Sequence, residues 1–229
     1  MSTRRIALLG GGFSNDEDGL LDDWMLGHVR AARPRVCFLP TASGDAVSYG
    51  ERFFEVFTAR HDCDPSVLSL FQRKLDDEAL RAYLLAQDVV YVGGGNTPAM
   101  LAVWQLYDLA AAFADLLDAG GVLAGISAGA NCWFDRYVTD SVPGGGVKPG
   151  LGFAAGSFCP HYDGESWRRP LVEQVARDHA GECLACDDSA AVRLDAQGRL
   201  VEAVASVEGK RAHRWIDGEP AALITRLLA

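Results

Sequence analysis

The chain has 229 residues, of which 49% are hydrophobic and 23% are charged. This usage is ordinary for a globular protein and excludes a disordered chain, and the length suits a single α/β domain over residues 1–229. A formal net charge of −10 argues against nucleic acid and anionic membranes as partners.

Short apolar runs alternate with helical patterns through the first half of the chain. The predicted strands are Ile6–Leu9, Val36–Leu39, Val67–Leu70, Asp88–Val92 and Val122–Ile126. The predicted helices are Leu20–Ala32, Tyr49–Arg60, Asp76–Gln87, a segment from Pro98 through Leu106, and Ala111–Ala119. Continuous apolar strands interleaved with helices indicate a parallel sheet that is buried on both faces. We therefore predict a three-layer α/β fold, with a mostly parallel sheet and helices on both faces.

The second half of the chain has a different pattern. Asp140–Ser157 is rich in glycine and proline and is predicted to form a long loop, and Trp167–Ala180 is predicted to form a helix. Ala185–Leu194 and Leu200–Val207 are predicted strands, followed by the segment Trp215–Leu228. Too few residues separate these two strands for a helical crossover, so we expect them to pair antiparallel. No repeat or linker divides the chain.

Six cysteines occur in the chain: Cys37, Cys63, Cys132, Cys159, Cys183 and Cys186. The N-terminal segment lacks the apolar core of a signal peptide, and no apolar run approaches the ~20 residues of a membrane span. We therefore expect a cytoplasmic protein with reduced thiols. Cys183 and Cys186 form a C-x-x-C pair, but no second pair of ligands follows at a spacing that suits zinc. We expect two ordinary, partly buried thiols and neither a metal nor another cofactor.

The strongest functional motif is G-x-S-x-G, centred on Ser127 directly after the strand Val122–Ile126. A nucleophile on a sharp turn between a strand and a helix projects its oxygen away from the backbone, and its neighbours have to be small. The neighbours here are Gly125, Ala128, Gly129 and Ala130. A glycine-rich helix start with a serine N-cap has the same pattern, but the preceding apolar strand favours a nucleophile elbow.

A nucleophilic serine needs a general base, and the chain has five histidines. His161 follows a short apolar segment, at the kind of strand end where α/β hydrolases carry catalytic groups. The other four have less suitable contexts: His28 and His179 lie in charged helical patterns, His61 lies in a loop, and His213 lies between two arginines. His161 is therefore the favoured base.

Four carboxylates compete to orient the histidine: Asp187, Asp188, Asp140 and Glu165. Each also fits a solvated loop side chain, and their positions in the chain leave the choice open.

The oxyanion of the reaction needs backbone donors. The amide of Ala128 directly follows the nucleophile, and Gly94 and Gly95 lie in the glycine run after the strand Asp88–Val92. A nucleotide-binding loop is the other interpretation of this run. It lacks both G-x-G-x-x-G and the G-K-[ST] of a P-loop, which makes phosphate binding less suitable.

Three segments together resemble the peptidase E (aspartyl dipeptidase) family, which is related to cyanophycinase. They are Tyr91–Thr97, Gly125–Ala130 and Pro160–Tyr162. The resemblance extends over nearly the whole chain. It implies a fold similar to class I glutamine amidotransferases, with a serine where those enzymes carry a cysteine.

The resemblance also implies roles for single residues. It implies Ser127 as nucleophile and His161 as base. The family's strand motif D-E-G-T-A-L resembles D-D-S-A-A-V here, which places Asp188 at the position of the acid. Another assignment in the family uses an aspartate in the loop after the elbow, and Asp140 is its nearest match. We favour Asp188.

The expected substrate is a dipeptide or short peptide, with some preference for N-terminal Asp. Family members carry a substrate-binding arginine soon after the histidine, and this chain has Arg168 and Arg169, with Trp167 closest to the family's position. In a strongly anionic chain a guanidinium offers a local anchor for a carboxylate. Asn96 is a further candidate for substrate binding. The alternative is that both arginines are solvated at a helix start and neutralised by Glu165 and Glu173.

Two functions from other classes remain open. One is a non-catalytic binding module that keeps the amidotransferase-like shape. The other is an amidase or transferase that depends on a cysteine, for which Cys132 is nearest to the elbow in sequence. A homodimer is possible for any of the three.

Overall fold

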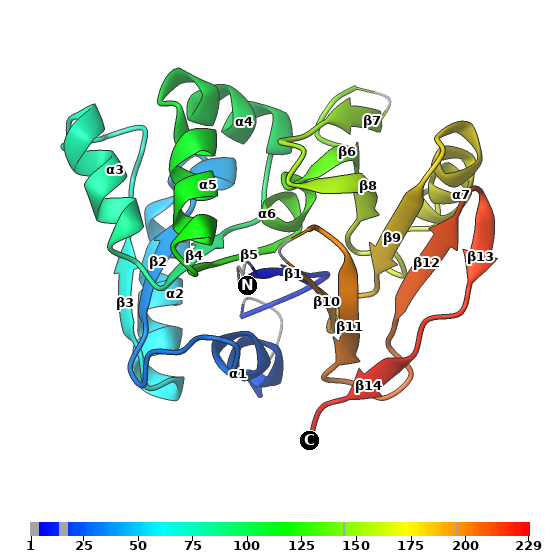
Figure 1. Ribbon diagram of the computed structural model, residues 1–229, viewed down its shortest axis with the longest axis horizontal. Helices are drawn as coiled ribbons and strands as arrows, with labels where there is room; N and C mark the ends of the chain where they lie inside the picture. Colours follow the sequence, from blue (N-terminus) through cyan, green and yellow to red (C-terminus); the bar gives the residue numbers. More distant parts are fainter. Residues whose placement is uncertain (1–4, 14–17, 144, 196) are drawn as a thin grey trace.

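The computed structural model describes residues 5–13, 18–143, 145–195 and 197–229 (Figure 1). Its helices are α1 (Leu20–Leu26), the 3₁₀ helix η1 (Thr41–Ser43), α2 (Val47–Arg60), α3 (Asp77–Leu85), α4 (Thr97–Leu106), α5 (Leu109–Asp118), α6 (Ala128–Asn131) and α7 (Arg168–Asp178). Its strands are β1 (Arg5–Leu9), β2 (Arg35–Leu39), β3 (Asp64–Val67), β4 (Val89–Val92), β5 (Val122–Ile126), β6 (Phe134–Thr139), β7 (Gly146–Pro149), β8 (Ala154–Cys159), β9 (Glu182–Cys186), β10 (Ala190–Leu194), β11 (Leu200–Ala205), β12 (Ala212–Ile216), β13 (Glu219–Ala221) and β14 (Thr225–Leu227). Residues 1–4 of the N-terminal segment, and Gly144 of the predicted loop, lie outside the described residues.

Within the described residues, one sheet has eight strands in the order β14-β11-β10-β1-β5-β4-β2-β3. Strands β1, β5, β4, β2 and β3 pair in parallel, as the continuous apolar runs predicted. Strand β10 pairs antiparallel with β1 and with β11. The α/β class, the mainly parallel pairing of this sheet and the antiparallel pairing of the late strands are therefore confirmed.

A second sheet, of six strands in the described chain, has the order β13-β12-β9-β8-β6-β7. This corrects the prediction of a single sheet. The predicted strand Ala185–Leu194 is in fact two strands, β9 and β10, which belong to different sheets. The chain crosses between the sheets at Asp187–Ser189, where Ser189 has a φ of 60° that no strand residue adopts. The predicted loop Asp140–Ser157 contains β7 and the first part of β8.

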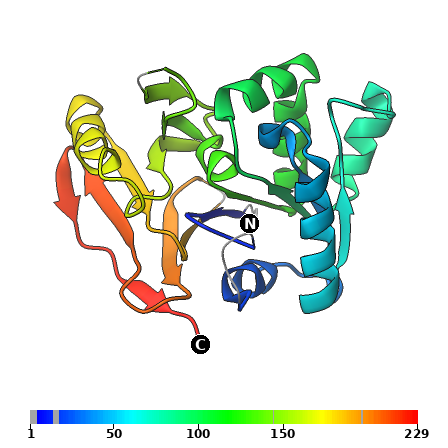
Figure 2. The same ribbon diagram turned by 180° about the vertical axis from the view of Figure 1, so that it is seen from behind.

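Helices cover both faces of the eight-stranded sheet. Successive side chains of each strand point to opposite faces, so each strand packs against helices on both sides. On β1, Ile6 and Leu8 pack with α3, α4 and α5, whereas Ala7 and Leu9 pack with α1 and α2. Helix α5 lies in front of the sheet in Figure 1, and α2 lies in front of it in the reversed view of Figure 2. The predicted three-layer arrangement is therefore present. Helix α7 packs on the six-stranded sheet.

Two predicted boundaries in the first half were wrong. Helix α1 ends at Leu26, six residues before the predicted end, because the amides of His28 and Val29 bond to carbonyls three residues back and tighten the chain into turns. Strand β3 ends at Val67, where the prediction began. Beyond it the Asp45 carboxylate accepts the amides of Leu70 and Phe71 and draws the chain off the sheet edge.

No single helix in the described part of the chain is long and apolar enough to cross a membrane. Helices α4 and α5 reach that length and composition only together, and they are bent by 88° at the break between them.

Candidate active site

Ser127 occupies the turn between β5 and α6 with φ 56° and ψ −114°, a conformation that side-chain-bearing residues rarely adopt. Close packing explains why its neighbours are glycines. A Cβ on Gly125 would lie 2.2 Å from the carbonyl oxygen of Gly129, and a Cβ on Gly129 would lie 2.2 Å from the carbonyl oxygen of Val92. The small residues of G-x-S-x-G therefore let the turn pack against β4. Helix α6 has only four residues, so single amides rather than a long helix dipole serve the turn.

His161 lies just after β8 and also has a positive φ, of 52°. Its Nδ1 lies 2.5 Å from Oδ1 of Asp188, in the turn between β9 and β10. Because a carboxylate only accepts hydrogen bonds, the proton of this bond belongs to Nδ1, which leaves Nε2 as a proton acceptor. Such a tautomer is the one that a general base next to a serine requires.

The end of β1 connects the turn at Ser127 with the turn Asp187–Ser189 between β9 and β10, which we call the aspartate turn. The amide of Ser127 donates to the carbonyl of Leu9 over 3.3 Å, and the amide of Gly10 donates to the carbonyl of Ala190 over 2.8 Å. A Cβ on Gly10 would lie 2.1 Å from the carbonyl oxygen of Asp187, so glycine is needed here. Among the described residues, Ser127 Oγ and His161 make no hydrogen bond to each other. Catalytic hydrogen bonds often tighten only when substrate binds.

The other three candidate carboxylates bind elsewhere. Asp187 is 5% exposed, lies 3.1 Å from Nε2 of His213, and accepts the amide of Arg211. Asp140 and Glu165 both bind the guanidinium of Arg168. Of the four carboxylates that the sequence left open, Asp188 is therefore the one that contacts His161.

The glycine run after β4 lies beside the serine. A Cβ on Gly94 would lie 3.3 Å from Ser127 Cβ and 3.7 Å from its Oγ. The amide of Gly94 donates to the Tyr49 hydroxyl over 3.2 Å. Gly95 has a φ of 139°, and a Cβ there would lie 2.2 Å from the carbonyl oxygen of Ala42. The amide of Ala128 is the first of α6, one of those that a helix leaves without an internal partner.

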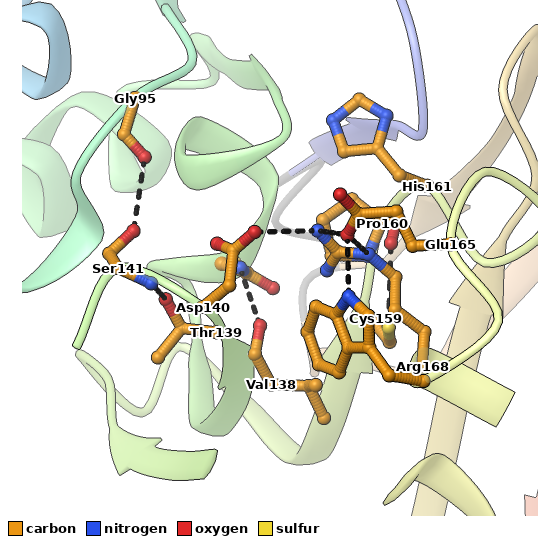
Figure 3. A network of polar contacts seen from close by, with 12 residues as sticks. Gly95, Val138, Thr139, Asp140, Ser141, Cys159, Pro160, His161, Glu165 and Arg168 are labelled. Carbon is orange, nitrogen blue, oxygen red and sulfur yellow. Dashed lines mark hydrogen bonds and ion pairs between the residues drawn. The ribbon is translucent and has the colours of Figure 1, made fainter. Parts of the chain in front are cut away.

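Asn96 has internal partners for both ends of its amide. Its Oδ1 accepts the amide of Ala99 over 2.9 Å and caps α4, while its Nδ2 donates to the carbonyl of Ser141 over 3.4 Å. The Ser141 hydroxyl in turn donates to the carbonyl of Gly95 over 3.5 Å (Figure 3). Asn96 thus links the glycine run to the loop after β6. The sequence had suggested this residue for substrate binding and did not predict this structural contact.

Arg168 differs from both expectations, the free anchor and the solvated side chain. It is only 6% exposed, and its guanidinium lies between Asp140, at 3.4 Å, and Glu165, at 2.9 Å, beneath His161 in Figure 3. Its charge is thus already matched by two carboxylates. Arg169 is exposed, 5.6 Å from the centre of the Tyr162 ring. Of the two expected neutralising partners, Glu165 does pair with Arg168, whereas Glu173 lies 4.0 Å from Arg177.

A cavity of about 670 Å³ opens behind the aspartate turn. Tyr162, Asp163, Arg169, Asp187, Lys210 and His213 are among its lining residues. The sequence prediction did not include Tyr49, Asp163 or Lys210. Of these three, only Asp163 could have been suspected from the sequence, because it stands two residues after the candidate base His161.

All six cysteines are buried and free. Burial raises the pKa of the Cys132 thiol well above its ordinary value, and raises that of Cys159 to about 12. Because the thiolate is the reactive form, this burial disfavours Cys132 as a nucleophile.

A strained serine at a strand-to-helix turn, in a sheet with helices on both faces, defines an α/β protein with a nucleophile elbow. Residues 6–201 match the family model described as Peptidase family S51. The chain is also 44% identical over 216 residues to the uncharacterized peptidase YgaJ of Bacillus subtilis (strain 168), a match that covers 93% of this chain and 92% of the relative.

Two solved structures have similar folds. A protein from Listeria monocytogenes EGD-e described as a peptidase E superposes with a TM-score of 0.66 at 16% identity, over 87% of this chain and 97% of the other. A peptidase from an acI-B1 Actinobacterium gives a TM-score of 0.68 at 16% identity, over 97% and 95%. The chain belongs to peptidase family S51, the peptidase E family, and is a serine-type peptidase.

Proposed function

We propose that the chain hydrolyses dipeptides or short peptides with Ser127 as nucleophile, His161 as general base and Asp188 as the carboxylate that orients the base. The observation that carries the proposal is the 2.5 Å contact between His161 Nδ1 and Asp188 Oδ1. The positive φ of Ser127, between a buried strand and a short helix, supports the role of the nucleophile.

In the proposed mechanism, Ser127 Oγ attacks the peptide carbonyl while His161 Nε2 takes the hydroxyl proton. The C–N bond then breaks and the same proton passes to the leaving amine. A water molecule, deprotonated by His161, hydrolyses the resulting ester and regenerates the serine. Asp188 stabilises the imidazolium that forms in each half of the reaction.

The proposed oxyanion donors are the amides of Gly94, Gly95 and Ala128. The short distance between Gly94 and the Ser127 side chain supports this assignment. The Gly94 amide donates to Tyr49, whereas the amides of Gly95 and Ala128 have no hydrogen-bond acceptor among the described residues, so these two are donors that need no exchange of partner. Removing one such donor in other hydrolases typically costs about 10²–10³ in kcat.

The direct test is labelling with a fluorophosphonate probe, which reacts with an activated serine whatever the natural substrate is. The parent protein should be labelled at Ser127, and Ser127→Ala should be neither labelled nor active on a dipeptide library. EDTA should not change the rate. A parent protein that is folded but not labelled would instead support a non-catalytic binding module. Peptidase activity that persists in Ser127→Ala would remove this serine from the mechanism.

A further inference from the structure

Asp163 joins three segments of the site through one carboxylate. It follows His161 by two residues in the loop after β8. Its Oδ1 accepts the backbone amide of Asp188 over 2.9 Å, and its Oδ2 forms an ion pair with the ammonium of Lys210, which lies between β11 and β12. The loop that carries the histidine is thereby tied to the turn that carries its carboxylate partner.

Both of these segments are conformationally strained, because His161 and Ser189 have φ values of 52° and 60°. Other hydrogen bonds hold the ends of these segments. The amide of Tyr162 donates to the carbonyl of Cys186, and the amide of Ser206 donates to the carbonyl of Ser189. The bond from Asp163 acts on Asp188 itself. A hydrogen bond to the amide of Asp188 restrains the backbone from which the Asp188 side chain reaches His161.

We propose that Asp163 and Lys210 are a positioning pair for the peptidase reaction, which holds the Asp188 carboxylate on Nδ1 of His161. This inference rests on the proposed function, because it presupposes that Ser127, His161 and Asp188 act together. Neither residue of the pair touches the reacting atoms. They act through the aspartate turn.

The charges of the pair support this role. Burial alone would raise the pKa of Asp163, but the hydrogen bonds from Lys210 and from the Asp188 amide hold it below its ordinary value. The same contact with Asp163 raises the pKa of Lys210. Asp163 therefore stays ionised and keeps its acceptor oxygens wherever the peptidase is expected to work.

Several charged groups surround the histidine and aspartate: Asp163 and Glu165 in the loop after β8, Arg168 at the start of α7, Asp187 after β9, and Lys210 and Arg211 before β12. Removing the charge of Asp163 makes the surroundings of His161 more positive, whereas removing the charge of Lys210 makes them more negative. An ion pair that served only the fold would change the labelling rate only through the folded fraction, whereas a positioning pair also changes the rate of the folded protein.

Four variants test the pair. Asp163→Ala removes both the acceptor and the charge, and Asp163→Asn keeps an acceptor oxygen but removes the charge. Lys210→Met removes the cation alone. Asp195→Asn is the matched control, because Asp195 also accepts backbone amides and pairs with a cation, Arg199, but lies at the far end of β10 from the aspartate turn.

The measurement is the second-order rate of fluorophosphonate labelling across pH, with the folded fraction of each variant followed by circular dichroism. Asp163→Ala should lose up to about 100-fold in rate, the size of effect that a misplacement of about 1 Å can have, and Asp163→Asn should lose less. The acid limb of the profile should move to lower pH in both Asp163 variants, because the imidazolium loses a nearby negative charge. It should move to higher pH in Lys210→Met and stay unchanged in Asp195→Asn.

Unchanged acid limbs in Asp163→Asn and Lys210→Met would overturn the inference. So would a loss of rate in Asp163→Ala that matches its loss of folded protein. Lys210→Met retains the carboxylate and its bond to Asp188, so it remains informative if Asp163→Ala fails to fold. A parent protein that is not labelled at Ser127 marks a different failure, that of the proposed function itself.

Discussion

Asp187 and Asp188 are adjacent in the chain, yet their carboxylates bind different histidines. Asp188 contacts His161 Nδ1 at 2.5 Å, while Asp187 lies 3.1 Å from Nε2 of His213. The turn between β9 and β10 thus brings two neighbouring carboxylates to different histidines, a difference that the spacing of the residues does not show. One faces the candidate site, and the other is buried beside β12.

The first prediction separates these roles. Asp188→Asn should lower kcat by up to about 10⁴-fold, because an amide in place of the carboxylate favours the wrong tautomer of the imidazole. Asp187→Asn should change the labelling rate little but lower the thermal midpoint, since it breaks a buried contact with His213 and the Arg211 amide. Labelling rates and calorimetry on both variants check this. The reverse pattern would assign the orienting role to Asp187.

The second prediction concerns the strain stored at the elbow. Ser127→Gly should raise the thermal midpoint, because relief of about 1–3 kcal/mol of backbone strain exceeds the ~0.5–1 kcal/mol entropic cost of a glycine. A protein of this size gains about 2–4 °C per kcal/mol. Ser127→Ala keeps Cβ and the strain, so it should melt near the parent. Calorimetry that finds the two variants equally stable would show that the positive φ costs little.

The third prediction addresses the cysteines. Iodoacetamide should modify none of the six thiols in the folded protein and should leave the labelling rate of Ser127 unchanged, because all six are buried and burial raises their pKa values where a shift is resolved. After unfolding in guanidinium, mass spectrometry should find all six modified. Rapid loss of activity with a single modification at Cys132 would revive the cysteine-dependent alternative.

The parallel half of the fold was predictable because its signals are local. Strands β1, β2, β4 and β5 are apolar runs, and glycine or proline directly follows β1, β2 and β4. Pro98 marks a helix start. The six-stranded sheet was not predictable in the same way. Strand β7 and the first part of β8 lie in the glycine-rich stretch Asp140–Ser157, and the order of the strands joins segments far apart in sequence, such as β9 and β12. The break falls at Asp187, Asp188 and Ser189, three polar residues of a kind that favours turns, and Ser189 adopts a positive φ there. The prediction ran one strand through them because apolar residues stand on both sides.

The same division applies to the candidate site. The elbow was predictable from G-x-S-x-G because its geometry needs small residues at fixed neighbouring positions. Spacing alone left four carboxylates as candidate partners of His161, because it does not show which side chains meet after β8 and β9. The choice of Asp188 came from the family resemblance, and Asp188 is the carboxylate that contacts His161. The ties made by Tyr49 and Lys210 had no signal in the sequence at all.

The last prediction concerns substrate preference, for which the two neighbouring arginines now have different expected roles. If the substrate carries an acidic N-terminal residue, Arg169 is the better anchor, because it is exposed while Arg168 is held between Asp140 and Glu165. Arg169→Ala should then lower kcat/KM for Asp-Leu by about tenfold or more, the equivalent of one lost charged hydrogen bond, and change Leu-Leu and Lys-Leu little. Arg168→Ala should instead lower stability and slow all three dipeptides together, because it leaves two carboxylates unmatched beside the site. Steady-state kinetics with the three dipeptides, alongside thermal melts, decide between these outcomes. An Asp-Leu rate that is no higher than that of Leu-Leu in the parent protein would end the proposal of acidic preference without touching the serine mechanism.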